Sequence, residues 1–188
     1  MNVQEIKSSL ILGSVYGLRM LGMFLILPIF AIYASNLDSS PTSLQIGLAL
    51  GIYGLTQAIF QIPFGMSSDY FGRKKVIYFG LSIFIIGSLI AGYAESIEGI
   101  ILGRSIQGSG AISAVLTALL ADITGEEQRT KAMAIIGASI GLTFALSLVL
   151  SPWLNDVIGV DGIFILMAIL SFTAFLFDAY IACNGSWY

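Results

Sequence analysis

Six long runs of apolar residues follow one another along the chain, separated by short polar stretches. Each run approaches or exceeds the roughly 20 residues that a helix needs to cross the hydrocarbon core of a bilayer. The pattern therefore predicts six transmembrane helices, at about 10–34, 44–64, 76–94, 97–121, 131–151 and 161–182. Residues 1–9 are expected to precede the first crossing, and residues 183–188 to form a short C-terminal stub.

The polar stretches between the apolar runs contain residues that favour turns. Asparagine, aspartate, serine and proline cluster at residues 36–41, and aspartate, threonine, glycine and glutamate at 122–129. Pro152 and the Asn155-Asp156 pair predict the reversal between the fifth and sixth helices.

The composition supports a membrane protein. Hydrophobic residues make up 57% of the 188 residues, charged residues only 10%, and the mean hydropathy is +0.93. A soluble domain has about 25% charged residues, so this chain cannot present an ordinary water-facing surface. The fold class is therefore predicted to be all-α and integral to the membrane, with the lipid bilayer as its solvent.

Several functional classes are excluded by the residue inventory. The single cysteine, Cys183, excludes an internal disulfide framework, and the lack of histidine excludes a histidine proton relay or a histidine-ligated metal. Eight basic residues without a basic stripe do not predict nucleic-acid binding. Because no nucleophile–base constellation is present either, we expect no enzyme, no metal and no bound cofactor.

The cations are distributed asymmetrically between the two sides of the predicted bundle. Six of them precede the first helix or follow the second and fourth: Lys7, Arg73, Lys74, Lys75, Arg129 and Lys131. The loops after the first, third and fifth helices contain acids but neither lysine nor arginine. By the positive-inside rule, both termini are expected in the cytoplasm.

Two arginines lie inside predicted spans, where an ionisable side chain is costly and faces a wet cavity or a partner. Arg19 is about ten residues into the first helix, and Arg104 is about a third of the way into the fourth. For Arg104 the alternative is snorkelling to the outer interface. Each arginine is followed closely by a glycine, Gly22 and Gly108. This echo favours two inverted repeats of three helices each.

The stretch from Gly65 to Lys75 combines glycines, an acid and three consecutive cations between two apolar runs. Asp69 and Arg73 are four residues apart, so they share a face and can pair if the helix continues past the membrane edge. Gly65 and Gly72 permit a tight turn or a close backbone approach. A solvated positive-inside turn is the alternative interpretation.

Some polar and small residues have open interpretations. The amides and phenols of Gln57, Gln61, Tyr53, Tyr33 and Gln107 are candidates for a substrate cavity, although tyrosines near helix ends also serve as interface anchors. Pro28 is a packing kink or a gating bend. Four Gly-x-x-x-Gly pairs, beginning at Gly13, Gly47, Gly99 and Gly137, predict close helix contacts.

The stretch from Gly65 to Lys75 resembles the signature loop of major facilitator superfamily transporters, Gly-x-x-x-Asp-x-x-Gly-Arg-Lys/Arg-x. The fixed positions of this loop are occupied here by Gly65, Asp69, Gly72, Arg73 and Lys74. The resemblance implies that these residues, with Asp122 at the end of the fourth helix, form a conformational latch. The string from Arg104 to Ala111 resembles the superfamily's fourth-helix motif, Arg-x-x-Gln-Gly-x-Gly-Ala, whose arginine is implicated in proton coupling; Arg19 is a second candidate.

The strings around Gly17 to Phe24, Gly51 to Gln57 and Arg104 to Ala111 are most similar to YajR-type bacterial drug–proton antiporters. The resemblance implies efflux of drugs or other small amphipathic compounds across a bacterial inner membrane. Alternating access would be driven by the proton gradient, so protons and a small-molecule substrate are the expected partners. A nutrient-importing facilitator and a truncated protein that does not transport are the alternatives.

Members of this superfamily have twelve helices in two halves, whereas six are predicted here. The resemblance implies that the chain corresponds to the N-terminal half. Its expected protein partner is a missing C-terminal half or a second copy of itself.

Overall fold

The computed structural model describes residues 3–35 and 41–183, and within them it contains helices and turns but no strand. The α-helices are α1 (Val3–Ile26), α2 (Phe30–Ser35), α3 (Ser43–Phe71), α4 (Arg73–Gly92), α5 (Ile97–Ser109), α6 (Ser113–Ile123) and α7 (Arg129–Cys183). A short 3-10 helix, Glu126–Gln128, precedes α7.

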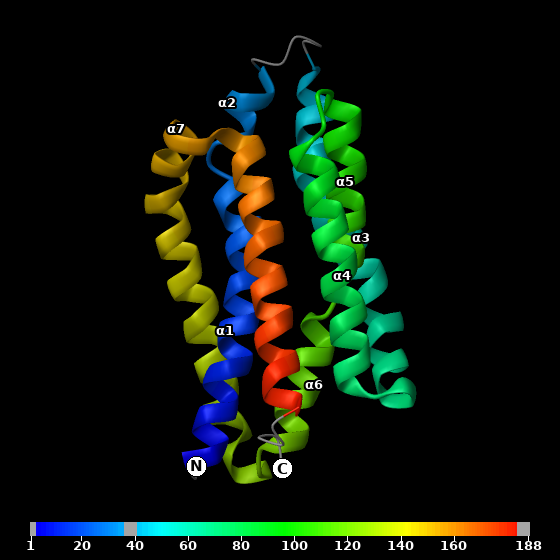
Figure 1. Ribbon diagram of the computed structural model, residues 1–188, viewed down its shortest axis with the longest axis vertical. Helices are drawn as coiled ribbons and strands as arrows, with labels where there is room; N and C mark the ends of the chain where they lie inside the picture. The colour runs from blue at the N-terminus through cyan, green and yellow to red at the C-terminus, as the bar shows by residue number, and fades with distance from the viewer. Residues whose placement is uncertain (1–2, 36–40, 184–188) are drawn as a thin grey trace.

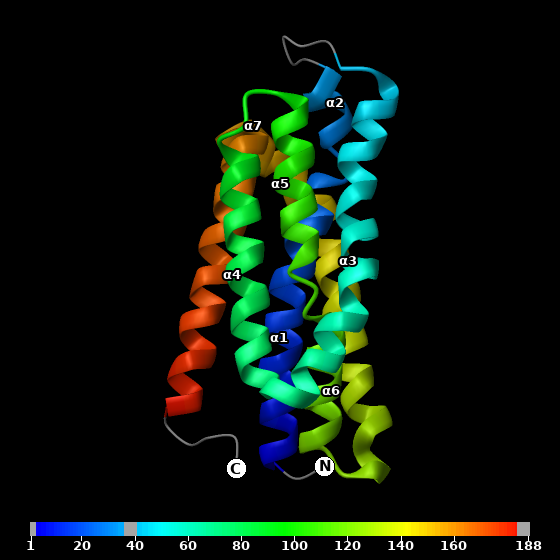
Figure 2. The ribbon, with the colours of Figure 1, turned by 90° about the vertical axis from the view of Figure 1, so that its right-hand side faces the viewer.

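The helices run along the long dimension of the molecule (Figures 1 and 2). Five helical stretches are long and apolar enough to span a membrane, and one of them, Glu126–Leu176, is 51 residues long. It reverses at Gly159 and therefore supplies two crossings. The start of α1 and the end of α7 lie at one end of the bundle, called the lower end here, and α2 lies at the upper end (Figure 1). The predicted all-α membrane bundle with six crossings is confirmed.

Two of the predicted helices are interrupted. The first breaks into α1 and α2 at residues 27–29, around Pro28, which cannot donate a backbone hydrogen bond. The fourth breaks into α5 and α6 at residues 110–112, after Gly110 leaves helical geometry with φ −73° and ψ 52°. The predictions of single helices over 10–34 and 97–121 were therefore wrong in this respect. Both interrupted crossings carry a buried arginine one to two turns before the break.

The lower turn between the second and third crossings is shorter than predicted. α3 continues to Phe71 and α4 begins at Arg73, so Gly72 alone separates them. Its φ of 95° and ψ of 139° are accessible to glycine and strained for other residues. Asp69 therefore lies in the last turn of α3, whereas Arg73 begins a new helix rather than continuing the same one.

The turn between the last two crossings lies further along the chain than predicted. The helix continues through Pro152 and the Asn155-Asp156 pair and turns only at Gly159, where φ is 70°. A proline removes one hydrogen bond but leaves the rest of a membrane helix intact, and Ser151 before it is anchored by a 2.5 Å hydrogen bond to the Leu25 carbonyl. The predicted end of the fifth helix at 151 was wrong for this reason, whereas the predicted start of the sixth helix at 161 lies directly after the turn.

Close packing surrounds α1 and α4. The turn at Gly159 divides α7 into a first arm before it and a second arm after it. Along α1, Gly13 faces Ser139 on the first arm, whereas Gly22 faces Met167 on the second arm. Glycine also allows α4 to approach α5 closely, since a Cβ on Gly103 would lie 2.6 Å from the Ala91 backbone nitrogen. Buried apolar side chains form two clusters, one around Phe30, Phe84 and Phe164 and the other around Leu12, Ile77 and Leu116.

The four Gly-x-x-x-Gly pairs fall into two groups. The pairs at Gly13 and Gly99 contact a neighbouring helix or turn, as predicted. At Gly47 and Gly51 of α3, and at Gly137 and Gly141 of α7, an added Cβ would meet nothing within 4 Å. Two helices, α3 and the first arm of α7, thus present small residues on a face that no described residue covers.

Candidate functional site

The charged cluster of the lower end is centred on Arg73. Its Nη1 lies 2.5 Å from Oδ1 of Asp69 at the end of α3, and its Nε lies 3.0 Å from Oδ2 of Asp122 at the end of α6. A single guanidinium therefore connects three helices, α3, α4 and α6. The fork geometry of arginine permits this, because its donors point in several fixed directions.

Burial and charge act on Arg73 in opposite directions. Partial burial disfavours its charged form, but the hydrogen bond and negative charge of Asp122, together with the charge of Asp69, outweigh this effect. The net result is that the pKa of Arg73 is raised above its ordinary value. The guanidinium consequently remains charged throughout the physiological pH range.

Ser68 belongs to the same cluster, and sequence reasoning missed it. Its side chain is buried, accepts a 2.5 Å hydrogen bond from Nη1 of Arg73 and donates a 2.6 Å bond to the carbonyl oxygen of Gly65. It occupies a variable position of the motif, so only its place beside Asp69 could have indicated it. Gly65 itself is not crowded, because a Cβ there would lie 3.8 Å from that of Ala114.

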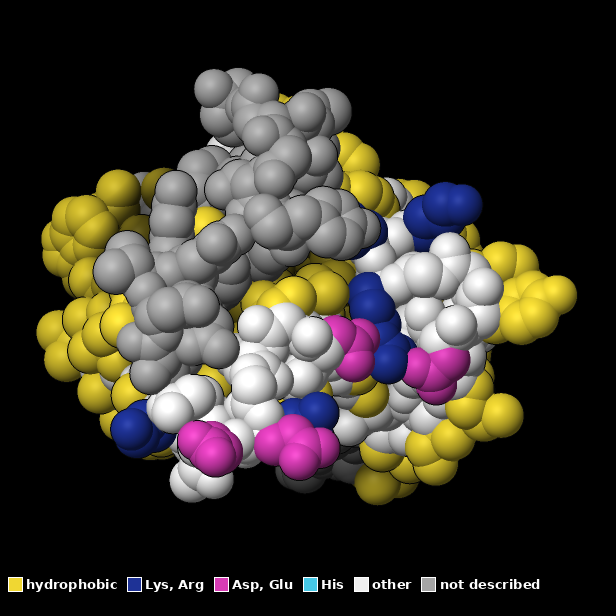
Figure 3. Space-filling model, turned by 90° about the horizontal axis from the view of Figure 1, so that it is seen from below, with side chains coloured by type: hydrophobic (Ala, Val, Ile, Leu, Met, Phe, Trp, Pro, Cys, Tyr) yellow, Lys and Arg dark blue, Asp and Glu magenta, His cyan; other side chains and the backbone are white. Residues whose placement is uncertain are grey.

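Acidic and basic side chains gather on the lower face of the molecule (Figure 3). Lys74 is half-buried and Lys75 is exposed in the first turn of α4, while Arg129 and Lys131 are exposed at the start of α7. The upper turns instead carry acids, among them Glu95 before α5 and Asp161 after Gly159. The predicted separation of charge between the two ends therefore holds for the described residues.

Arg104 is enclosed between α3, α4 and α5, with 1% of its surface exposed. Its Nε donates to the carbonyl oxygen of Ala49 (3.3 Å), its Nη1 donates to Oε1 of Gln107 (3.2 Å), and its guanidinium lies 4.9 Å from the ring centre of Tyr53. The Gln107 amide donates in turn to Ser88 of α4 at 2.8 Å. Such enclosure is not compatible with snorkelling to the outer interface.

Arg19 is equally enclosed, with 2% of its surface exposed. Its Nη1 donates to Oγ of Ser113 at 2.7 Å and its Nη2 to the carbonyl oxygen of Gly110 at 2.8 Å. The same Ser113 hydroxyl accepts a 3.4 Å hydrogen bond from Gln57 of α3. Arg19 therefore connects the first crossing to the break in the fourth.

The proposed cavity residues do not form one group. Tyr53 and Gln57 lie one turn apart on α3, beside Arg104 and Arg19 respectively, whereas Gln61 lies one turn further along and is half-buried. Tyr33 lies at the upper end, where its hydroxyl donates a 2.6 Å hydrogen bond to Oδ1 of Asp161. Gln107 is fully buried and bridges α4 and α5.

The two buried arginines have no carboxylate partner among the described side chains. Each also retains one buried nitrogen without a hydrogen bond, Nε of Arg19 and Nη2 of Arg104, as do Oη of Tyr53 and Oε1 of Gln57. Buried polar atoms are usually paired. The layer of α1, α3 and α5 thus carries two positive charges and free hydrogen-bonding capacity in the membrane interior.

Together, the six apolar crossings, the charged lower turn and the enclosed arginines define a multi-pass membrane protein. The model of the Major Facilitator Superfamily matches residues 12–182. The chain belongs to this superfamily.

Relatives and solved structures agree with this assignment. The inner membrane transport protein YajR of Escherichia coli K12 is 50% identical over 175 residues, which cover 93% of this chain and 38% of YajR. The class B tetracycline resistance protein of Escherichia coli is 32% identical over 124 residues, 65% of this chain and 31% of that protein. The crystal structure of the POT family transporter PepTSo has the same fold, with a TM-score of 0.73 at 18% identity over 97% of this chain and 38% of PepTSo.

The chain spans less than half the length of the first curated relatives that it matches, which are transporters. The match to YajR covers nearly all of the present sequence.

Proposed function

We propose that the chain forms one half of a proton-coupled exporter of drugs or other small amphipathic compounds, working by alternating access in a bacterial inner membrane. Its lower end, with the start of α1 and the end of α7, faces the cytoplasm. This orientation rests on the positive charges of the lower turns and the acids of the upper turns.

The names of relatives support export. A tetracycline resistance protein of Escherichia coli and a multidrug resistance protein of Bacillus subtilis are 32% and 37% identical to parts of this chain. YajR, similar over 93% of the chain, is an inner membrane transport protein. We infer from these names that a broad, amphipathic substrate class is more consistent with the chain than a single nutrient.

The enclosure of Arg104 is the observation that supports the proposed proton coupling. A guanidinium with only neutral partners in a membrane interior is costly, and arginine is effectively always protonated in proteins. A positive charge held there alters the proton affinity of any carboxylate that approaches it. In the proposed mechanism, such a carboxylate is on the substrate or on the partner half.

The Arg73 cluster would hold one state of the alternating-access cycle. It connects the lower ends of α3, α4 and α6 through three exposed or half-exposed side chains. Exposed ion pairs contribute about 0–1 kcal/mol each, so the cluster is weak enough to open and close during transport. We assign Gly72 and Lys74 to the same latch, as the positions that set its turn.

The partner half would cover the open glycine faces. Gly47, Gly51, Gly137 and Gly141 have nothing within 4 Å of an added Cβ. Apolar side chains next to them, among them Leu48 and Leu142, are exposed. In the bilayer, small residues allow another helix to approach closely. A C-terminal half or a second copy of the chain would pack against α3 and the first arm of α7.

Transport by the 188-residue chain in proteoliposomes tests the proposal. A pH gradient is imposed and the movement of a fluorescent cationic drug is followed, with Arg104→Ala and Asp69→Asn as variants. We expect proton-driven flux that Arg104→Ala abolishes when the protein assembles as a dimer. Folded wild-type protein without flux, alone or co-reconstituted with the C-terminal half of YajR, would contradict it.

A further inference from the structure

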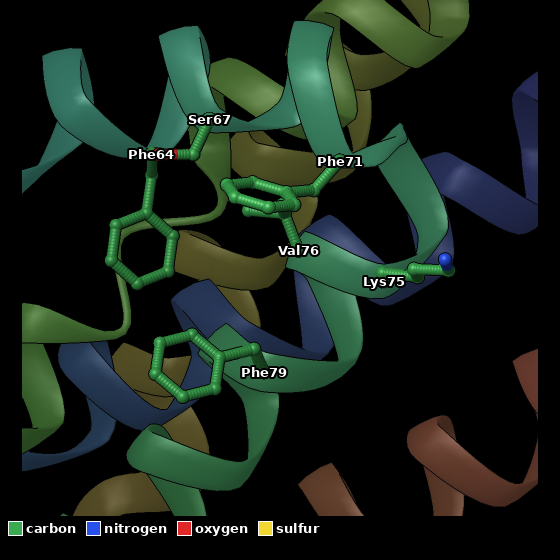
Figure 4. A pocket seen from close by; sticks show the side chains of 6 residues that line it. All are labelled: Phe64, Ser67, Phe71, Lys75, Val76 and Phe79. Atoms are coloured by element: carbon green, nitrogen blue, oxygen red, sulfur yellow. The ribbon is translucent and has the colours of Figure 1, made fainter.

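An aromatic groove lies on the outer surface of the bundle where α3 ends and α4 begins (Figure 4). Its volume is about 380 Å³, and it is lined by Phe64, Ser67, Phe71, Lys75, Val76 and Phe79. On α3 the lining residues are spaced i, i+3 and i+7, which places them on one face of the helix. The groove is separate from the Arg73 cluster and from both buried arginines.

The walls of the groove are apolar and remain open to the surroundings. The rings of Phe64 and Phe79 stack with their centres 6.0 Å apart, while Phe71 and Phe79 are each 62% exposed. Phe71 lies across the hollow from these two rings, and Lys75 lies at its edge (Figure 4). The groove therefore presents an exposed aromatic surface beside one cation.

The groove runs along the direction of a phospholipid in the bilayer. The membrane boundary predicted from the sequence falls at residues 64 and 76, so Phe64 and Lys75 lie at this edge and Phe79 lies on the hydrocarbon side. The seven residues from Phe71 back to Phe64 correspond to a helical rise of about 10 Å. The polar end of the groove is therefore at headgroup level, with its aromatic end deeper in the membrane.

Lys75 supplies a charge that no carboxylate among the described residues neutralises. Arg73, two residues earlier, is paired with Asp69 and Asp122, whereas Lys75 forms no ion pair with a described residue. A basic pocket at the membrane interface attracts anionic headgroups, and the hydroxyl of Ser67 provides a hydrogen-bond donor at the same level.

We propose that this groove binds one anionic phospholipid, with its phosphate on Lys75 and one acyl chain along Phe64, Val76 and Phe79. This binding does not depend on the transport cycle or on the identity of the transported compound. The bound lipid would fill the space between the end of α3 and the start of α4, beside the turn at Gly72.

Fluorescence quenching by lipids with brominated acyl chains tests the proposal. The full chain, with Trp153 and Trp187 changed to phenylalanine and Phe79→Trp as reporter, is reconstituted in phosphatidylcholine vesicles. A fixed mole fraction of either brominated phosphatidylglycerol or brominated phosphatidylcholine is included. We expect the lipid beside Phe79→Trp to be enriched about fivefold in phosphatidylglycerol, the selectivity of one lysine near the surface.

Matched variants separate the groove from general surface charge. Lys75→Gln should abolish the enrichment, and Lys75→Arg should retain it. Lys131→Gln removes another exposed lysine of the lower end and should leave the enrichment unchanged. A reporter at Ile169→Trp, on the exposed surface of α7, should be quenched equally by both lipids.

Three results would overturn the proposal. One is equal quenching of Phe79→Trp by the two lipids. Another is enrichment that persists in Lys75→Gln, or that Lys131→Gln reduces to the same extent. The third is a reporter that neither lipid quenches, since this would mean that protein, rather than lipid, covers the groove. Lys75 is exposed, so unchanged thermal unfolding of its variants verifies that each comparison is made on folded protein.

Discussion

The guanidinium of Arg19 in α1 donates a 2.8 Å hydrogen bond to the carbonyl oxygen of Gly110, the residue that ends α5. The last carbonyls of a helix lack partners within the helix and carry its negative dipole end. The Gly110 carbonyl also accepts a 2.9 Å hydrogen bond from the backbone N–H of Ile112, so Arg19 adds a second, charged donor at the break in the helix. The other terminal nitrogen of Arg19 binds Ser113, the first residue of α6, so one side chain joins both sides of the break.

Ser113→Ala should destabilise the protein by about 1–3 kcal/mol, because it removes an acceptor from a buried charge and leaves that charge underpaired. Thr117→Ala is the matched control, since Thr117 binds only the Ser113 carbonyl within its own helix. Thermal unfolding in detergent measures both. A Ser113→Ala variant as stable as Thr117→Ala would mean that the Arg19 contact contributes nothing.

Gly103→Ala should be strongly destabilising, because its Cβ would lie 2.6 Å from the backbone nitrogen of Ala91 and force α4 and α5 apart. Overpacking of this kind costs typically about 1–3 kcal/mol. Gly137→Ala meets nothing within 4 Å and should stabilise its helix by up to about 1 kcal/mol. Unfolding temperatures of the two variants should therefore move in opposite directions; a shift in the same direction would contradict the packing.

Gly141→Leu tests whether the open face of α7 is an interface. Gly141 is exposed and an added Cβ there meets nothing within 4 Å, so we expect the unfolding temperature to remain near that of the wild type. It should nevertheless abolish association with a partner half and any flux that depends on it. Chemical cross-linking in vesicles measures the association. Undiminished cross-linking in this variant would rule out the face as the contact.

Gly72→Ala should cost about 1–3 kcal/mol, because its φ of 95° is a conformation that residues with a Cβ rarely adopt. Gly65→Ala provides the comparison within the same motif: its Cβ would make an ordinary contact at 3.8 Å from Ala114. Thermal unfolding should separate the two glycines clearly. Equal losses would indicate that the turn relaxes to accept a side chain.

Arg73→Lys should open the lower end with little loss of stability. Lysine offers one ammonium where the guanidinium contacts Asp69, Asp122 and Ser68 at once, and these partly exposed contacts are individually weak. In a Cys183→Ser background, a thiol at Ala114→Cys should react faster with a membrane-impermeant maleimide when Arg73 is replaced. An unchanged labelling rate would argue against a latch.

The charged cluster shows how far local spacing could predict the site. The proximity of Asp69 to Arg73 follows from four residues of separation, and the structure places them together although Gly72 divides the helix between them. Asp122 is 49 residues from Arg73, and Ser68 lies at a variable motif position. Their contacts depend on how α6 and α3 pack, which spacing does not specify. The latch itself remains a prediction.

The sequence by itself determined the class of fold, the number of crossings and the end at which cations gather, because apolar length and charge are properties of each segment alone. Only the tertiary structure decided which of four equivalent glycine pairs are covered: those at Gly13 and Gly99 meet neighbours, and those at Gly47 and Gly137 do not. The rotation of a helix about its axis is set by all its packing partners together, and lipid provides no hydrophobic drive that would reveal it in the pattern.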